Sequence, residues 1–128
     1  MNILLDTHIL LWMLNEPERL SPAQQSLLRD QENLLVISAI SLCEISIKVG
    51  LGKLKLPTTP DLFFQPHLQQ PGVQVLPVLA SHGLHLHALP LHHRDPFDRI
   101  LIAQAQVERL PLMTANTQFH QYKIKILA

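Results

Sequence analysis

Three acidic residues, Asp6, Glu44 and Asp98, fall in three separate segments that each contain apolar runs. Carboxylates that pack closely repel one another unless a cation neutralises them. Carboxylate oxygens are the hard ligands that Mg²⁺ and Mn²⁺ prefer, with several waters retained on the ion. Such a site can activate a water molecule and neutralise the charge that develops on a phosphate oxygen. If the fold brings the three acids together, they favour metal-dependent hydrolysis of phosphodiester bonds.

Asp6 and Glu44 each have a simpler structural interpretation. Asp6 follows the apolar run "ILL", where an acid is often only the cap of the next helix. Glu44 lies on the same helical stripe as Ile40 and Ile47, where a carboxylate is costly unless it is paired or borders a cleft. Lys48, four residues later, could pair with Glu44 at the surface. The alternative is a Glu44 carboxylate that points into a polar pocket.

The segment "HHRDPFDRIL" at 92–101 contains two aspartates with different predicted roles. Asp95 followed by Pro96 is typical of a helix start, with Asp95 as the N-cap. Asp98 lies in the first turn, on the face that continues through Ile102 and Ala105 toward the packed side. We therefore assign capping to Asp95, and only Asp98 is expected among the converging acids.

Short apolar runs alternate with helical segments along the chain, which is typical of βαβ units and a mainly parallel sheet. Strands are expected within 2–7, 33–38, 72–78, 110–115 and 123–127. Helices are expected at about 8–15, 21–31, 38–49, 60–70 and 95–108, with a helix or turn in 80–90 and a helical turn near 116–121. The predicted fold class is α/β, a three-layer α/β/α sandwich that forms a single domain over 1–128.

The carboxyl ends of parallel strands form one edge of the sheet, where functional groups gather. Polar residues follow three of the expected strands, namely Asp6 with Thr7, Ser38, and Thr114 with Asn116. These residues are predicted to share that edge.

The composition excludes several classes of protein. The chain of 128 residues is 47% hydrophobic with a formal net charge of zero, which argues against a broad DNA-binding surface. The one cysteine, Cys43, cannot form an intramolecular disulfide and is expected to be buried in its helix. Without a secretory leader or an apolar run of membrane-spanning length, the protein is expected to be cytoplasmic and not membrane-bound.

Three blocks of this sequence, taken together, resemble the PIN-domain family. They are "ILLDTHILLW", "ISLCEISIKVGLGKLKLP" and "HHRDPFDRILIAQA" with the "LPLMTANTQF" that follows. Within that family they look like the VapC-type toxins of bacterial type II toxin–antitoxin pairs. The resemblance implies an α/β/α sandwich, Mg²⁺- or Mn²⁺-dependent ribonuclease activity, an RNA substrate and a cognate antitoxin. The family's three metal-binding acids then correspond to Asp6, Glu44 and Asp98.

Other positions take supporting roles from the same resemblance. The hydroxyls of Thr7 and Thr114 match positions that hydrogen-bond to the acidic cluster. Many members have a fourth acid where this chain has Asn116, which favours one firmly held cation and a second that is weak or substrate-assisted. The missing charge also leaves open a weak or inactive enzyme that serves as a protein-interaction module.

Basic and apolar residues near these blocks are candidates for binding. We expect RNA contacts from His93, Arg94, Arg99 and Lys48, and a basic rim that Lys48 forms with Lys53 and Lys55. The apolar segment around Trp12 could dock an antitoxin helix or the second protomer of a homodimer.

Two other kinds of site are not supported. The eight histidines lack zinc-site spacing, and the cysteine count is one. A phosphoaspartyl phosphatase or receiver domain suits the size and the sheet, but "DTH" lacks the second acid such phosphatases use.

Overall fold

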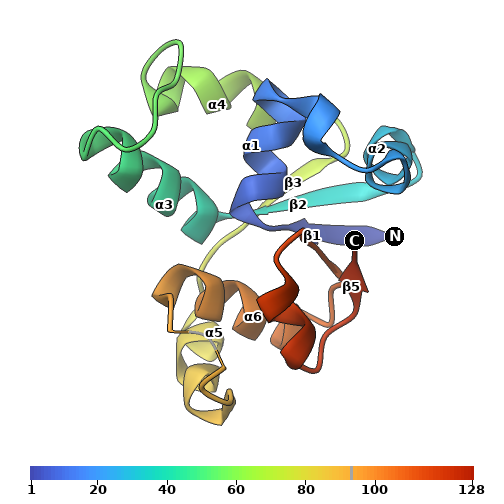
Figure 1. Cartoon of the computed structure of the whole chain (residues 1–128), viewed down its shortest axis with the longest axis vertical. Helices are drawn as coiled ribbons and strands as arrows, with labels where there is room; N and C mark the ends of the chain where they lie inside the picture. Colours follow the sequence, from blue (N-terminus) through green and yellow to red (C-terminus); the bar gives the residue numbers. More distant parts are fainter. Residues whose placement is uncertain (93) are drawn as a thin grey trace.

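The centre of the protein is a five-stranded parallel sheet with the strand order β3-β2-β1-β4-β5 (Figure 1). The computed structural model describes residues 1–92 and 94–128. The strands are β1 (Asn2–Leu5), β2 (Leu34–Ser38), β3 (Val73–Leu76), β4 (Leu112–Met113) and β5 (Ile126–Leu127). Leu5 at the end of β1 pairs with Ile37 of β2 and with Met113 of β4. The carboxyl ends of these three strands are therefore aligned, as the sequence predicts.

Successive side chains of the central strands enter two different apolar cores. Ile3 and Leu5 of β1 lie in one core with Ile37 of β2. Leu4 and Val36 lie in the other core. Since alternate side chains point to opposite faces, both faces of the sheet are covered, which is why these strands read as continuous apolar runs.

Helices cover the two faces as separate layers. The α-helices are α1 (Thr7–Asn15), α2 (Pro22–Arg29), α3 (Ala39–Gly50), α4 (Pro60–Leu68), α5 (Ala80–His85) and α6 (Pro96–Glu108). Three short 3₁₀ helices are η1 (Pro17–Arg19), η2 (Leu86–Ala88) and η3 (Thr117–Gln121). Leu10, Ile45 and Phe64 bring α1, α3 and α4 onto the first core, whereas Leu101 and Ile102 bring α6 onto the second. Figure 1 shows α5 and α6 on the side opposite α1 to α4, so the predicted α/β/α sandwich is confirmed.

The helices begin where the sequence predicts. Ser21 caps α2 with a reciprocal pair of hydrogen bonds to Gln24, and Pro22 occupies the first turn. Ser38 caps α3 by accepting a hydrogen bond from the amide of Ile40. Within the described residues, none of the helices is long and apolar enough to cross a membrane.

A buried glutamine joins α6 to the carboxyl edge of the sheet. The Gln104 side chain is fully buried, and its Oε1 accepts a hydrogen bond from the Ser38 hydroxyl at 2.5 Å. Its Nε2 donates to the carbonyl of Pro77 at 3.3 Å, in the segment that follows β3. Because Ser38 also caps α3, Gln104 connects the helix that carries Asp98 to the start of the helix that carries Glu44.

Replacement of Gln104 by leucine should therefore destabilise the fold. The substitution keeps the side chain's approximate volume but leaves the buried Ser38 hydroxyl without its acceptor, which costs roughly 1–3 kcal/mol. Urea unfolding of Gln104→Leu should show a lower midpoint than wild type. Gln65→Leu, at an exposed position of α4, is the control and should unfold near the wild-type midpoint. Equal midpoints for both variants would show that the Gln104 connection contributes nothing.

Candidate active site

Asp6 lies directly after β1 and is only 1% exposed. Its Oδ1 accepts a hydrogen bond from the amide of Ile9 at 2.7 Å, so the carboxylate caps α1. Its Oδ2 accepts a hydrogen bond from the hydroxyl of Thr114, which follows β4. The capping role that the sequence allows is thus present. The same carboxylate also joins the ends of two neighbouring strands.

Burial raises the pKa of Asp6 above its ordinary value, because the charged form loses its hydration. Hydrogen bonds from Ile9 and Thr114 and the charge of His8 act in the opposite direction, but they are the smaller effects. The hydrogen bonds and nearby charge thus offset only part of the cost of ionising Asp6, and such perturbed carboxyls are common at functional sites.

Glu44 lies on the inner side of α3 and is 3% exposed. Its Oε1 accepts a hydrogen bond from the Thr7 hydroxyl at 2.8 Å, and its Oε2 lies 2.8 Å from Nζ of Lys48. The side chain of Lys48 is 41% exposed, against 4% for that of Glu44. Glu44 thus combines its two predicted roles. It pairs with Lys48, and its carboxylate is buried beside the hydroxyl of Thr7.

The two aspartates at the start of α6 differ as predicted. Oδ1 of Asp95 accepts hydrogen bonds from the amides of Phe97 at 2.9 Å and Asp98 at 3.3 Å, which is the geometry of an N-cap. Asp98 is half-buried, on the helix face of the buried Ile102 and Ala105.

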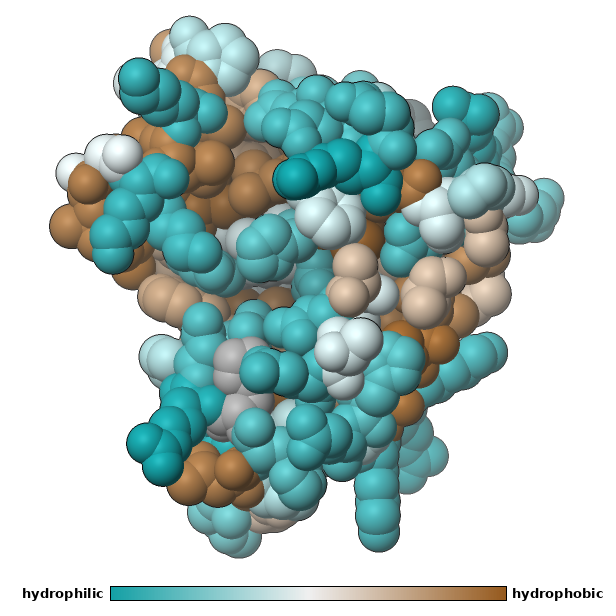
Figure 2. All heavy atoms as spheres, in the orientation of Figure 1, coloured by the Kyte–Doolittle hydropathy of each residue, from teal (hydrophilic) through white to brown (hydrophobic). Residues whose placement is uncertain are grey.

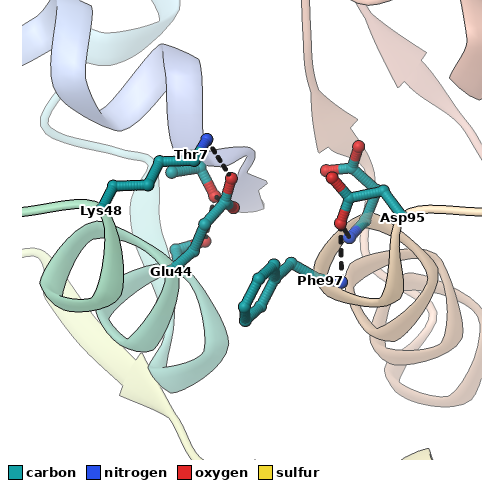
Figure 3. A network of polar contacts seen from close by, with 7 residues as sticks. Thr7, Glu44, Lys48, Asp95 and Phe97 are labelled. Carbon is teal, nitrogen blue, oxygen red and sulfur yellow. Dashed lines mark hydrogen bonds and ion pairs between the residues drawn. The ribbon is translucent and has the colours of Figure 1, made fainter. Parts of the chain in front are cut away.

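Lys48 connects the two halves of the candidate site. Its hydrogen bond to Glu44 raises the pKa of the ammonium most, and the nearby charges of Asp95 and Asp98 raise it further. Figure 3 shows Thr7, Glu44 and Lys48 on one side of the site and Asp95 and Phe97 on the other. The ring of Phe97 points toward α3. Glu44 of α3 and the two aspartates at the start of α6 therefore all raise the pKa of the Lys48 ammonium.

The residues fit a divalent cation by their chemistry, although they do not form a ready-made cage. Within 1–92 and 94–128, no group of three His, Cys, Asp or Glu side chains is arranged to hold a metal ion. Carboxylate oxygens are nevertheless the ligands that Mg²⁺ and Mn²⁺ prefer, and the buried charge of Asp6 favours a cation. Since Lys48 already contacts Glu44, a cation that binds Glu44 must compete with this ammonium.

Comparison with known proteins agrees with this fold. A family model of the PIN domain matches residues 3–125. The chain belongs to the PIN-domain family. No curated protein matches the sequence of this PIN domain.

Solved structures share the fold of this PIN domain at low sequence identity. A chain of VapBC2 from Rickettsia felis, bound to a DNA fragment from its promoter, has a TM-score of 0.75 at 18% identity, with 99% of this chain and 98% of that chain covered. A chain of DNA-bound VapBC from Salmonella typhimurium has a TM-score of 0.68 at 16% identity, with coverage of 99% and 97%. A chain of a toxin–antitoxin complex from Klebsiella pneumoniae has a TM-score of 0.62 at 18% identity, with coverage of 98% and 96%.

Asn116 contacts the carboxyl edge of the sheet through Thr114. The backbone amide of Asn116 donates a hydrogen bond to Oγ1 of Thr114 at 3.0 Å, and Thr114 in turn donates to Asp6. Its own Oδ1 accepts a hydrogen bond from the amide of Gln118 at 2.9 Å and caps η3. The side-chain oxygen of Asn116, at the position where many family members have an acid, is therefore already used for capping.

The basic residues expected to bind RNA lie in different environments. Arg99 donates hydrogen bonds to the carbonyls of Pro90 and Leu86, so at least part of its guanidinium anchors the segment before α6. Arg94 is exposed, and the prediction for His93 lies outside the described residues.

Two expectations for α3 are wrong. Cys43 is exposed rather than buried, and Ile47 is 48% exposed although it was expected to share an apolar stripe with Glu44. The buried positions of the helix are Ser41, Glu44 and Ile45. Since Cys43 and Ile47 are four residues apart, they share the opposite, exposed face.

Ser41 is a site residue that the sequence interpretation missed. Its Oγ lies 3.1 Å from Oγ1 of Thr7, which also donates to Glu44. Its position three residues before Glu44, on one helix face, was the signal that could have identified it.

The raised pKa of Asp6 gives a prediction for stability in the absence of metal. A carboxyl group whose pKa is higher in the folded than in the unfolded state stabilises the fold at low pH. This contribution is lost as the pH rises through the folded-state pKa. Asn can still cap α1 but carries no charge. In EDTA, the unfolding free energy of Asp6→Asn relative to wild type should therefore increase from pH 4 to pH 8.

Asp61 offers a control of opposite sign. A hydrogen bond from Thr59 lowers the pKa of this exposed acid, so its contribution is present at neutral pH and is lost as the pH falls. The unfolding free energy of Asp61→Asn relative to wild type should thus decrease from pH 4 to pH 8. If Asp6→Asn behaves like Asp61→Asn, burial does not control the Asp6 carboxylate.

Proposed function

We propose that this PIN domain is a Mg²⁺- or Mn²⁺-dependent endoribonuclease that acts as the toxin of a toxin–antitoxin pair. One observation carries the proposal. Asp6 and Glu44 are held at the same sheet edge by Thr114 and Thr7, and the charge of Asp98 reaches the lysine bound to Glu44. The acid that follows β1 and the acids of α3 and α6 thus border one region, in a chain of the PIN family.

Asp6, Glu44 and Asp98 would hold the cation, which supplies activation of a water molecule and neutralises charge on phosphate oxygens. The protein's own contribution is to fix these ligands. The amide of Ile9 and the hydroxyl of Thr114 bind the two oxygens of Asp6, which restricts rotation of its carboxylate. Glu44 is restricted in the same way by Thr7 and Lys48.

Lys48 has a second role in this proposal. It neutralises Glu44 when no metal is bound, and its flexible stem lets the half-exposed ammonium turn toward a phosphate once a cation takes its place. Asn116 supplies one charge fewer than an acid would, which favours a single firmly held cation. A second cation would be weak or would depend on the substrate.

The comparisons support a protein antitoxin as partner. One similar structure is described as a toxin–antitoxin complex, and others are VapBC proteins bound to DNA. An RNA substrate places the activity in the cytoplasm, and we retain a homodimer as the expected assembly. Ile9 and Leu10 of α1 are buried in the first core, and Trp12 is half-buried against it, so only part of this helix remains for a partner.

The two aspartates at the start of α6 provide the test. Wild type should cleave labelled RNA with Mn²⁺ or Mg²⁺ and lose this activity in EDTA. Asp98→Asn removes a cation ligand and should reduce the cleavage rate by more than about 100-fold. Asp95→Asn is the matched control, because Asn caps a helix as well as Asp does, and it should retain most of the activity.

Two outcomes would contradict the proposal. Cleavage that persists in EDTA, or in both Asp6→Asn and Asp98→Asn, would exclude the mechanism based on metal and acids. The lack of a ready-made cage among the described residues and the presence of Asn116 favour one alternative function, an inactive module that binds proteins. Wild type that binds a partner but cleaves no RNA with either metal would support that module.

A further inference from the structure

A pocket adjoins the candidate active site, between α1 and the loop that follows α3. Its volume is about 320 Å³, and its lining includes Thr7, Trp12 and Lys48. Thr7 and Lys48 are the two residues that bind the Glu44 carboxylate, so the pocket is continuous with the candidate active site. Figure 2 shows the molecule hollowed on the side of α1 and α3, with apolar atoms inside the hollow and hydrophilic side chains at its rim.

The pocket concentrates positive charge in a protein whose formal net charge is zero. Four of the chain's ten lysines and arginines line it, namely Arg19, Lys48, Lys53 and Lys55, together with one acid, Glu16. Arg19 pairs with Glu16 at 3.2 Å, and Lys48 pairs with Glu44. Among the described residues, Lys53 and Lys55 form no ion pair. A recess lined by one sign of charge attracts ligands of the other sign.

The backbone holds the two free lysines in place. Gly52 adopts a positive φ of 73°, and the amide of Lys53 donates to the carbonyl of Lys48 at 2.9 Å, so the loop folds back on the end of α3. Leu54 and Leu56 pack against the first core, whereas the alternating Lys53 and Lys55 are exposed. The leucines thus fix both lysines on the pocket side, which reduces the entropy lost when they bind a ligand.

We propose that this pocket binds the phosphodiester backbone of single-stranded RNA beside the bond to be cleaved. The proposal rests on the function proposed above. A nucleic-acid strand carries one negative charge per nucleotide, so a strand with one phosphate at the acids places the next phosphates alongside. Because Thr7 and Lys48 belong to both places, Lys53 and Lys55 are positioned to bind those phosphates. With a volume of about 320 Å³, the recess is too small to enclose a duplex, which favours a single strand.

The test compares two lysine pairs with the same spacing. Lys53→Ala/Lys55→Ala removes the two pocket lysines without an ion pair, and Lys123→Ala/Lys125→Ala removes two exposed lysines before β5, at the opposite edge of the sheet. Binding of a fluorescent oligouridylate is measured in EDTA over a range of salt concentrations, so no cleavage is required. Thermal unfolding of each variant establishes that it is folded.

The pocket variant should bind the RNA on the order of tenfold more weakly at low salt. The negative slope of log K against log salt should become shallower by about 1.4, because two contacts to a single strand are lost. The control pair should leave the slope unchanged. Equal losses in both variants, or none in either, would overturn the pocket even if wild type cleaves RNA with Mn²⁺. Conversely, weaker binding in the pocket variant alone supports the pocket even if cleavage fails.

An acidic peptide is the competing occupant, and poly-glutamate tests it in the same assay. If the peptide binds more tightly than the RNA, and only when Lys53 and Lys55 are present, the pocket belongs to an acidic protein segment. That result would overturn the RNA assignment.

Discussion

The buried carboxylate of Asp6 at the end of the central strand is the constraint around which the candidate site is arranged. One oxygen starts α1, and the other accepts from Thr114 at the end of the neighbouring strand. The charge therefore cannot move to solvent without loss of a helix cap and a link between strands. Burial raises the pKa of this carboxyl, so the fold carries an electrostatic cost at neutral pH. Proteins retain such costs mainly where function requires them.

Lys48 is the counterpart of this constraint. Its ammonium forms an ion pair with Glu44, and the charges of Asp95 and Asp98 across the site raise its pKa further. It thereby offsets part of the repulsion among acids that α3 and α6 bring together. The same lysine lines the basic pocket beside α1, so positive charge continues from the acids to Lys53 and Lys55. The site thus has negative charge where a cation would bind and positive charge where a polyanion would lie.

The sequence predicts the fold well because its signals are local. The cap at Asp95 and the continuous apolar strands each depend on a few neighbouring residues, and the structure contains both. The position of Asp6, Ser38 and Thr114 at one edge of the sheet is also predictable, since parallel strands necessarily align their carboxyl ends.

What the sequence could not supply depends on tertiary packing. The buried face of α3 is set by the helices and strands around it, so a stripe through Ile47 was a plausible but wrong choice. The hydrogen bond between Ser38 and Gln104 joins residues 66 positions apart, and no local pattern indicates it. The basic pocket likewise requires α1 to lie beside the loop after α3. Spacing alone showed a cluster of lysines, whereas the structure shows that they face a recess next to Glu44.

We propose above that Asp6, Glu44 and Asp98 together bind one divalent cation. Crystals grown with Mn²⁺ test this binding most directly, because the anomalous signal of manganese locates the ion independently of the protein atoms. We expect a single strong peak in contact with all three carboxylates, with the Lys48 ammonium moved away from Glu44. A peak at other residues, or no peak while Lys48 still pairs with Glu44 at saturating Mn²⁺, would contradict it.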